Sequence, residues 1–291
     1  MQTVTVATMN AHNLFGPNDI KPGSRDRVKS ERSQAALAEQ IDRVDADVVA
    51  LQELTSEESL RELILSRRDL AEKYPHVALV PSYDHRGINV GIISKHPFNA
   101  VVSHKDTEFP LTDGSGNGTF SRDFLRVDIN TDSDPDTELS VYNTHSKSRR
   151  PSDSGPSSET IRLSQAVAMR QIAEEEMKPY PGRLFVLTGD FNDGFKDESV
   201  QAILNPKQGE KWLDSLDHLP DDERNTWPAN PKPGKFPPIQ FDHIIYPERF
   251  DSQLVESKKI RIEASDSSDT KWVSTAASDH LPVVATFEIR D

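Results

Sequence analysis

Short apolar segments separated by polar loops recur along nearly the whole chain. Short runs of apolar or alternating residues between turn-forming residues are typical of β-strands. They predict strands at residues 3–9, 47–51, 76–80, 88–94, 124–129, 139–143, 184–188, 241–246 and 282–289. Three longer segments repeat apolar residues at three- and four-residue spacing, which predicts amphipathic helices at residues 26–44, 56–73 and 158–178. This alternation of strands and helices indicates an α/β protein.

The loops between these elements bear on the number of domains. Loops rich in proline, glycine and serine are predicted at residues 16–26, 104–122, 146–158 and 205–238. None of them separates two self-sufficient sets of strands and helices, so we expect a single domain over residues 1–291. Thr55 and Glu58 have the spacing of a helix capping box, which predicts a strand-to-helix turn just beyond Glu53.

Composition narrows the class of protein further. The 291 residues are 34% hydrophobic and 28% charged, and no apolar run approaches the roughly 18 residues that a membrane span needs. The chain has no cysteine, which excludes disulfides, thiolate zinc sites and cysteine nucleophiles. No signal-peptide pattern precedes Thr3, so we leave the compartment open between the cytoplasm and secretion after removal of a signal. We expect a monomer.

The net charge of −14 argues against a wide basic surface for a polyanion. Any phosphate substrate is therefore expected to be held locally. Polar residues of the kinds that bind metals and phosphates stand at the ends of the predicted strands, where residues distant in sequence can meet at one edge of a fold. They are Asn10, Glu53, His145, Asp190, Asn192, Asp242, Asp279 and His280.

These residue types suit the hydrolysis of a phosphodiester. A hard cation such as Mg²⁺ takes carboxylate ligands, for which Glu53 and Asp279 are suitable. Histidine and aspartate orient water and transfer protons, and asparagine holds an oxygen without adding negative charge beside a phosphate. Each residue alone has a structural explanation as a turn, cap or core residue. Their joint occurrence at successive strand ends favours an active site.

Several of these segments resemble motifs of the endonuclease/exonuclease/phosphatase superfamily. Residues 8–15 (TMNAHNLF) resemble its opening motif and residues 50–53 (ALQE) its metal-carboxylate motif. Residues 188–192 (TGDFN) are similar to its G-D-x-N motif, and residues 278–283 (SDHLPV) resemble its terminal S-D-H-x-P-V motif at every fixed position. Residues 143–145 (NTH) and 120–122 (FSR) resemble segments of its deoxyribonuclease I branch. The motifs follow the family order and span essentially the whole chain.

The resemblance implies a four-layer α/β sandwich of two mixed β-sheets with outer helices. It also implies that Glu53 holds the principal metal, Mg²⁺ or Mn²⁺ with Ca²⁺ as a further possibility, and that Asn10 and Asp279 lie close by. These are expectations for the metal side of the site.

The resemblance assigns the catalytic side as well. Asp190 would orient or deprotonate the water with the help of Asn192, and His145 would serve the leaving group. His280, polarised by Asp242, would contact the scissile phosphate. Which histidine is acid and which is base stays open, and Asp84 is a candidate for the acidic partner of His145.

Two loops without acidic residues, 139–152 and 224–241, bear on the substrate. In the first loop, Lys147 and Arg149 are predicted to bind phosphates, and in the second, Trp227, with Lys232 and Lys235, is predicted to hold a base or phosphate. The resemblance implies that Arg122 also contacts a phosphate. These loops, with the motifs of His145 and Arg122, make a nuclease acting on DNA or RNA the first hypothesis. The alternatives are a hydrolase of lipid headgroups or sugar phosphates, and a catalytically inactive binding module.

Overall fold

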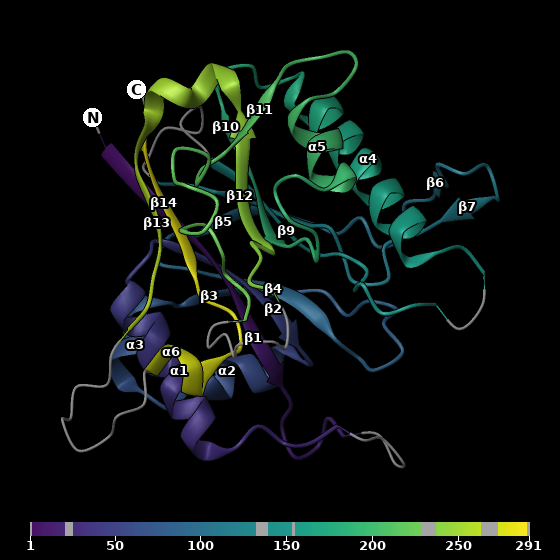
Figure 1. The fold of residues 1–291 in the computed structure, drawn as a ribbon. Helices are drawn as coiled ribbons and strands as arrows, with labels where there is room; N and C mark the ends of the chain where they lie inside the picture. Colours follow the sequence, from purple (N-terminus) through teal and green to yellow (C-terminus); the bar gives the residue numbers. More distant parts are fainter. Residues whose placement is uncertain are drawn as a thin grey trace.

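Two six-stranded β-sheets form the centre of the protein, which we describe from a computed structural model (Figure 1). The structure describes residues 2–20, 26–131, 139–152, 155–228, 237–262 and 273–289. The first sheet has the order β13 (Leu254–Lys259), β14 (Val283–Ile289), β1 (Gln2–Leu14), β2 (Val48–Leu54), β4 (Asn89–Ser94), β3 (His76–Leu79). The second has the order β11 (Trp212–Asp214), β12 (Asp242–Pro247), β10 (Leu184–Asp190), β9 (Leu139–His145), β8 (Leu125–Ile129), β5 (Phe98–Val102).

Helices cover the outer face of each sheet (Figure 1). The first sheet is covered by α1 (Glu31–Val44), α2 (Glu57–Leu65), α3 (Arg68–Lys73) and α6 (Val273–Ala277). The second is covered by α4 (Ser158–Met177) and α5 (Glu198–Leu204). A small hairpin of β6 (Phe109–Pro110) and β7 (Asn117–Gly118) extends beside α4, and a 3₁₀ helix, η2 (Glu248–Gln253), links β12 to β13. The predicted four-layer α/β sandwich is confirmed.

Three hydrophobic clusters hold the four layers together. The cluster between the sheets includes Val4 and Val6, whereas Ala7 and Met9 of the same strand pack in the cluster beneath the helices. Because successive side chains of a strand point to opposite faces, β1 buries apolar residues on both sides. This explains why the central strands read as continuous apolar runs in the sequence.

The strand ends that carry polar residues lie at one edge because of how the strands pair. β1 is parallel to β2, with Asn10 opposite Gln52, and β9 is parallel to β10. The carboxyl ends of parallel neighbours lie at the same end of a sheet.

Within the described ranges, no helix has the length and apolar character of a membrane span.

Some predicted boundaries were wrong. The helix predicted over residues 56–73 is two helices, α2 and α3, and its N-cap is Ser56 rather than Thr55, because the Ser56 hydroxyl accepts from the amide of Ser59 at 3.1 Å. The Thr55 hydroxyl instead donates to the carbonyl of Leu14 at 2.8 Å. Strands β5, β11 and β13 and helices α5 and α6 were not predicted, because they are short or carry mixed polar and apolar residues.

Candidate active site

Three neighbouring strands of the second sheet place a histidine and two aspartates in one row. In the register of these strands, Asp190 at the end of β10 pairs with His145 on β9 and with Asp242 on β12. The first sheet contributes Asn10 of β1, and His280 comes from the segment directly before β14. The fold therefore gathers five of the predicted residues where the two sheets meet.

The Asp190 carboxylate is the common neighbour of this group. Its Oδ2 accepts from Asn10 Nδ2 at 3.0 Å and lies 3.6 Å from His145 Nε2 and 3.9 Å from His280 Nε2. Its Oδ1 accepts from the backbone amide of Asn192 at 2.9 Å. Burial raises the pKa of Asp190 to about 7; the charge of His280 and these hydrogen bonds oppose the rise, and the charge of Asp242 adds to it. Such a carboxylate can exchange a proton near neutral pH.

His280 is oriented by Asp242, since its Nδ1 lies 2.9 Å from Asp242 Oδ2. Burial alone lowers the pKa of His280, but the charges of Asp242 and Asp190 outweigh this effect and the net pKa is raised. The second oxygen of Asp242, Oδ1, is buried and has no hydrogen-bond partner among the described residues. Ligand atoms of Asp190, Asp242 and His280 all lie within 4.8 Å of one another, so these three residues are a possible cation-binding group.

His145 differs from His280 in its surroundings. Its pKa is held well below the ordinary value by burial and by the positive charges of Arg122, His280 and Arg86. Within the described residues its Nδ1 is buried without a hydrogen-bond partner. The suggested pairing with Asp84 is therefore wrong, and Asp84 Oδ2 instead lies 3.2 Å from Arg122 Nε. The ring is thus expected to be neutral.

The three residues predicted to bind the metal surround the end of β1. Glu53 Oε2 accepts from the amide of Asn13 at 2.9 Å, and Asn10 Oδ1 accepts from the amide of His12 at 2.8 Å. Asp279 Oδ1 lies 3.6 Å from His12 Nδ1. His12, Asn13 and Glu53 all have positive φ angles, of 48°, 57° and 60°, a conformation that non-glycine residues adopt rarely and often at functional sites.

Lys29 is a buried residue at this end of the site that sequence reasoning missed. Its Nζ donates to the carbonyls of Ala277 at 2.8 Å and His12 at 3.2 Å. Burial lowers its pKa to about 8, against the opposing charges of Glu53 and Asp279. A lysine before a helix carries no motif that would have identified it. Its ammonium offsets part of the negative charge of these two carboxylates.

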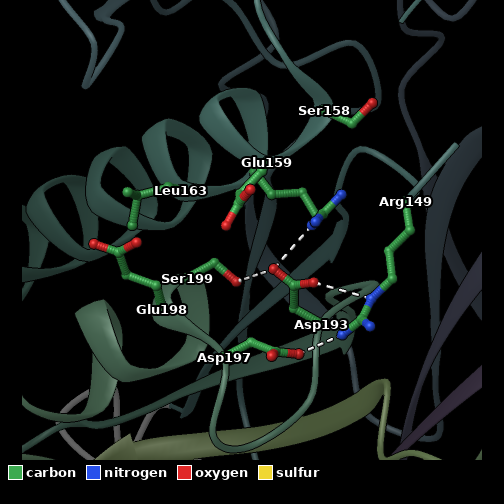
Figure 2. Close-up of a pocket in the computed structure, with 9 residues that line it drawn as sticks. Arg149, Ser158, Glu159, Leu163, Asp193, Asp197, Glu198 and Ser199 are labelled. Carbon is green, nitrogen blue, oxygen red and sulfur yellow. Dashed lines mark hydrogen bonds and ion pairs between the residues drawn. The ribbon is translucent and has the colours of Figure 1, made fainter. Parts of the chain in front are cut away.

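The predicted phosphate-binding residues are tied to protein groups. Arg122 is buried and donates to the carbonyl of Ser146 at 3.1 Å, and the Lys147 ammonium donates to the carbonyl of Arg150 at 3.0 Å. Arg149 is 44% exposed and donates to the carbonyl of Asn192 at 3.1 Å. Figure 2 shows its ion pairs with two aspartates of the neighbouring pocket. Of these three, Arg149 is the most accessible to a substrate.

The predicted Trp227 lies beside the site. Its ring stacks on Phe241, with centroids 5.3 Å apart, and its Nε1 donates to Asp279 Oδ2 at 3.2 Å. The guanidinium of Arg149 lies over the other ring of this pair, 5.2 Å from the centroid of Phe241. Lys232 and Lys235, predicted for the same loop, lie outside the described residues.

Fold and site together define an α/β sandwich with a buried acid–histidine centre where its two sheets meet. The Endonuclease/Exonuclease/phosphatase family model matches residues 7–280, and the chain belongs to this family. The matched range contains the residues described above, from Asn10 to His280. The comparison with curated proteins found no match.

Solved structures share this fold at low sequence identity. The human Nocturnin catalytic domain with a bound sulfate anion is 14% identical, with a TM-score of 0.68 over 99% of this chain and 95% of that one. TDP2 from D. rerio complexed with a single strand DNA product is 17% identical, with a TM-score of 0.64 over 99% and 100% of the two chains. A family protein from Bacteroides thetaiotaomicron is 19% identical, with a TM-score of 0.62 over 99% and 98%.

Proposed function

We propose that this protein is a divalent-metal-dependent phosphodiesterase that cuts nucleic acid strands. Family membership supports hydrolysis of a phosphoester, and the geometry around Asp190 is the observation that carries the proposal. One carboxylate oxygen is shared by the side chains of Asn10, His145 and His280. A group of this kind can hold a water molecule, accept its proton and contact the oxygens of a phosphate.

The roles of the chain's own residues follow from their surroundings. Asp190, with a pKa raised towards neutrality, orients or deprotonates the attacking water, and Asn192 assists from the same turn. His280, held by Asp242, contacts the scissile phosphate as a protonated ring. His145 serves the leaving group from the other side of Asp190. Because the pKa of His280 is raised and that of His145 is lowered, His280 is the protonated ring that can donate a proton, and His145 is the neutral ring whose N–H can hydrogen-bond to the leaving oxygen.

A divalent cation fits the metal side of this site. We propose Glu53 as its main ligand with Asn10 and Asp279 adjacent, and Mg²⁺ or Mn²⁺ as the ion, because the available donors are hard oxygen atoms. Such a cation supplies neutralisation of the negative charge that develops on the phosphate. The charges of Glu53 and Asp279 stabilise the buried Lys29 ammonium, which indicates a negative electrostatic potential in this pocket. Asp190, Asp242 and His280 are the alternative ligand group, and a cation bound there would require a neutral His280 in place of the protonated ring assigned above.

A nucleic acid strand is supported by the stacked side chains beside the site. Trp227, Phe241 and Arg149 form a layered arrangement of two rings and a guanidinium, which suits a nucleobase next to the cleaved phosphate. One structural neighbour, TDP2 from D. rerio, is complexed with a single strand DNA product. The net charge of −14 favours a substrate held at few phosphates.

A substrate panel tests the proposal. Purified protein is incubated with plasmid, single-stranded DNA, RNA, bis-p-nitrophenyl phosphate, sphingomyelin and inositol phosphates, each with Mg²⁺, Mn²⁺ or Ca²⁺ and with EDTA. We expect metal-dependent cleavage of at least one nucleic acid, and its loss in Asp190→Asn. Cleavage of sphingomyelin or inositol phosphates with intact nucleic acids would instead support the lipid or sugar-phosphate alternative. Equal activity of Asp190→Asn would refute the assignment of the site.

A further inference from the structure

A second buried histidine lies behind the turn that carries Asp190 and Asn192. His243 follows Asp242 on β12, and successive side chains of a strand point to opposite faces, so its ring is directed away from His280. The side chain has no exposure to solvent. Its Nδ1 lies 2.5 Å from Asp214 Oδ2, and its Nε2 lies 3.0 Å from the backbone carbonyl oxygen of Asp193.

These contacts fix the direction of the hydrogen bonds. A carbonyl oxygen can only accept, so His243 Nε2 carries the proton and donates it to Asp193. Asp214 holds the opposite nitrogen and also accepts from Gln240 Nε2 at 3.0 Å. The ring of Phe191 packs edge-on against His243, with centroids 5.3 Å apart. One imidazole thereby holds the residues on both sides of Asn192.

The turn that it holds has an unfavourable backbone conformation. Asn192 has a φ of 55°, and in that conformation its amide donates to Asp190 Oδ1. Non-glycine residues keep such a conformation only where their surroundings enforce it. The Asp193 side chain fixes the far side of the turn through ion pairs with Arg149 at 3.2 Å and Arg162 at 2.8 Å, and the Ser199 hydroxyl donates to it at 2.8 Å (Figure 2).

We propose that His243, backed by Asp214, is a positioning residue that holds the turn of residues 190–193 in register with His280. It touches neither substrate nor reacting atoms and acts through the Asp193 carbonyl. Movement of this turn would change the distances that Asp190 Oδ2 keeps to Asn10, His145 and His280. This inference rests on the proposed hydrolase function, because its consequence for activity is a loss of alignment at Asp190.

The chain provides a matched control in His104. This histidine is also buried between a carboxylate and a backbone carbonyl, with Nε2 3.0 Å from Glu176 Oε1 and Nδ1 2.6 Å from the carbonyl of Phe124. Its partners belong to α4 and the segment before β8 rather than to the turn at Asp190. Phenylalanine at either position removes the donors while filling the space. Both variants are expected to lose thermal stability, His243→Phe more than His104→Phe, because Asp214 is completely buried whereas the Glu176 side chain is 23% exposed.

The activity of the two variants should differ. We expect His243→Phe to lower kcat by about 10- to 100-fold, the range seen when groups that orient active-site ligands are removed. KM should stay within about threefold, since no substrate contact is lost. His104→Phe should keep both constants, and His243→Gln, which restores a donor to Asp193, should recover part of kcat. Equal kcat losses at positions 243 and 104, or none at 243, would overturn the inference. If His243→Phe does not fold, His243→Leu against His104→Leu, which also lack a side-chain donor, decides by the same criterion.

Hydrogen–deuterium exchange separates this inference from the proposed function. Faster exchange in residues 190–194 of His243→Phe, but not of His104→Phe, is expected whether or not the wild-type protein cuts any substrate tested. Unchanged exchange in that segment would refute the positioning role. A wild-type protein that hydrolyses no phosphodiester would refute the proposed function and leave the exchange result to stand by itself.

Discussion

Replacing Asp242 with asparagine tests the pair that orients His280. The Asp242 side chain is completely buried, and at an effective dielectric constant of about 20 two unit charges 2.9 Å apart attract by roughly 6 kcal/mol. That energy corresponds to about a 10⁴-fold change in a proton-binding constant. Whether His280 binds the phosphate or transfers a proton, the reaction uses its protonated ring, which loses this stabilisation in Asp242→Asn.

We therefore expect Asp242→Asn to lower kcat by about 10³- to 10⁴-fold, similar to the loss that follows the same change in a Ser–His–Asp triad. The assay is steady-state cleavage of the best substrate from the panel with saturating metal. Nuclear magnetic resonance titration of His280 should show a lower pKa in the variant, because the opposing charge is gone. Asp128→Asn is the control, since Asp128 is buried on β8 and accepts from Ser140 at 2.7 Å.

A kcat within tenfold of the wild-type value, or a loss in Asp128→Asn of the same size, would refute this reasoning. An unchanged pKa of His280 would show that Asp242 does not hold the charge assigned to it. The two measurements are independent, because the titration needs no substrate.

Three further results are expected. Glu53→Gln should weaken Mn²⁺ binding in calorimetry by at least about tenfold, whereas the exposed Glu58→Gln should not; equal affinities would remove Glu53 from the metal site. Asp190 must be ionised to accept a proton, and its pKa is raised to about 7. We therefore expect kcat/KM to rise as the pH passes through about 7, and a rise that is already complete below pH ~5 would contradict the role of Asp190. Trp227→Ala should raise KM for oligonucleotides by roughly 5- to 150-fold, with Trp227→Phe near wild type; equal KM values would end the stacking hypothesis.

Most of the fold could be predicted because the central strands are buried on both faces. Their apolar runs appear in the sequence without ambiguity, as in residues 184–188 of β10. β13, by contrast, carries the charged residues Glu256 and Lys258 at exposed positions and lacks such a run. It forms because β14 offers it an edge to pair with. Pairing of this kind depends on tertiary structure and leaves no local periodicity.

The candidate site likewise contains residues that the sequence could predict and residues that it could not. His145, Asp190 and Asp242 stand at strand ends, Asn10 lies in β1 where its pairing with β2 shifts register, and His280 lies shortly before β14, so their meeting follows from strand order and register. His243 and Lys29 could not be found by that route. Both bind backbone carbonyl oxygens, and a carbonyl can be offered by any residue type, so sequence records nothing about the partner.

Backbone strain marks the site independently of residue type. Among the residues that the structure describes, four of the five non-glycine residues with positive φ are His12, Asn13, Glu53 and Asn192, and all four lie at the ends of β1, β2 and β10 where the proposed site residues converge. The pairing of β1 with β2 shifts register between Asn10 and Leu14, and β2 with β4 between Leu51 and Leu54. Such irregularities turn side chains away from the regular alternation of a strand. Glu53 gains its hydrogen bond to the amide of Asn13 where both residues have this conformation, so the strain and the placement of its carboxylate have the same structural origin.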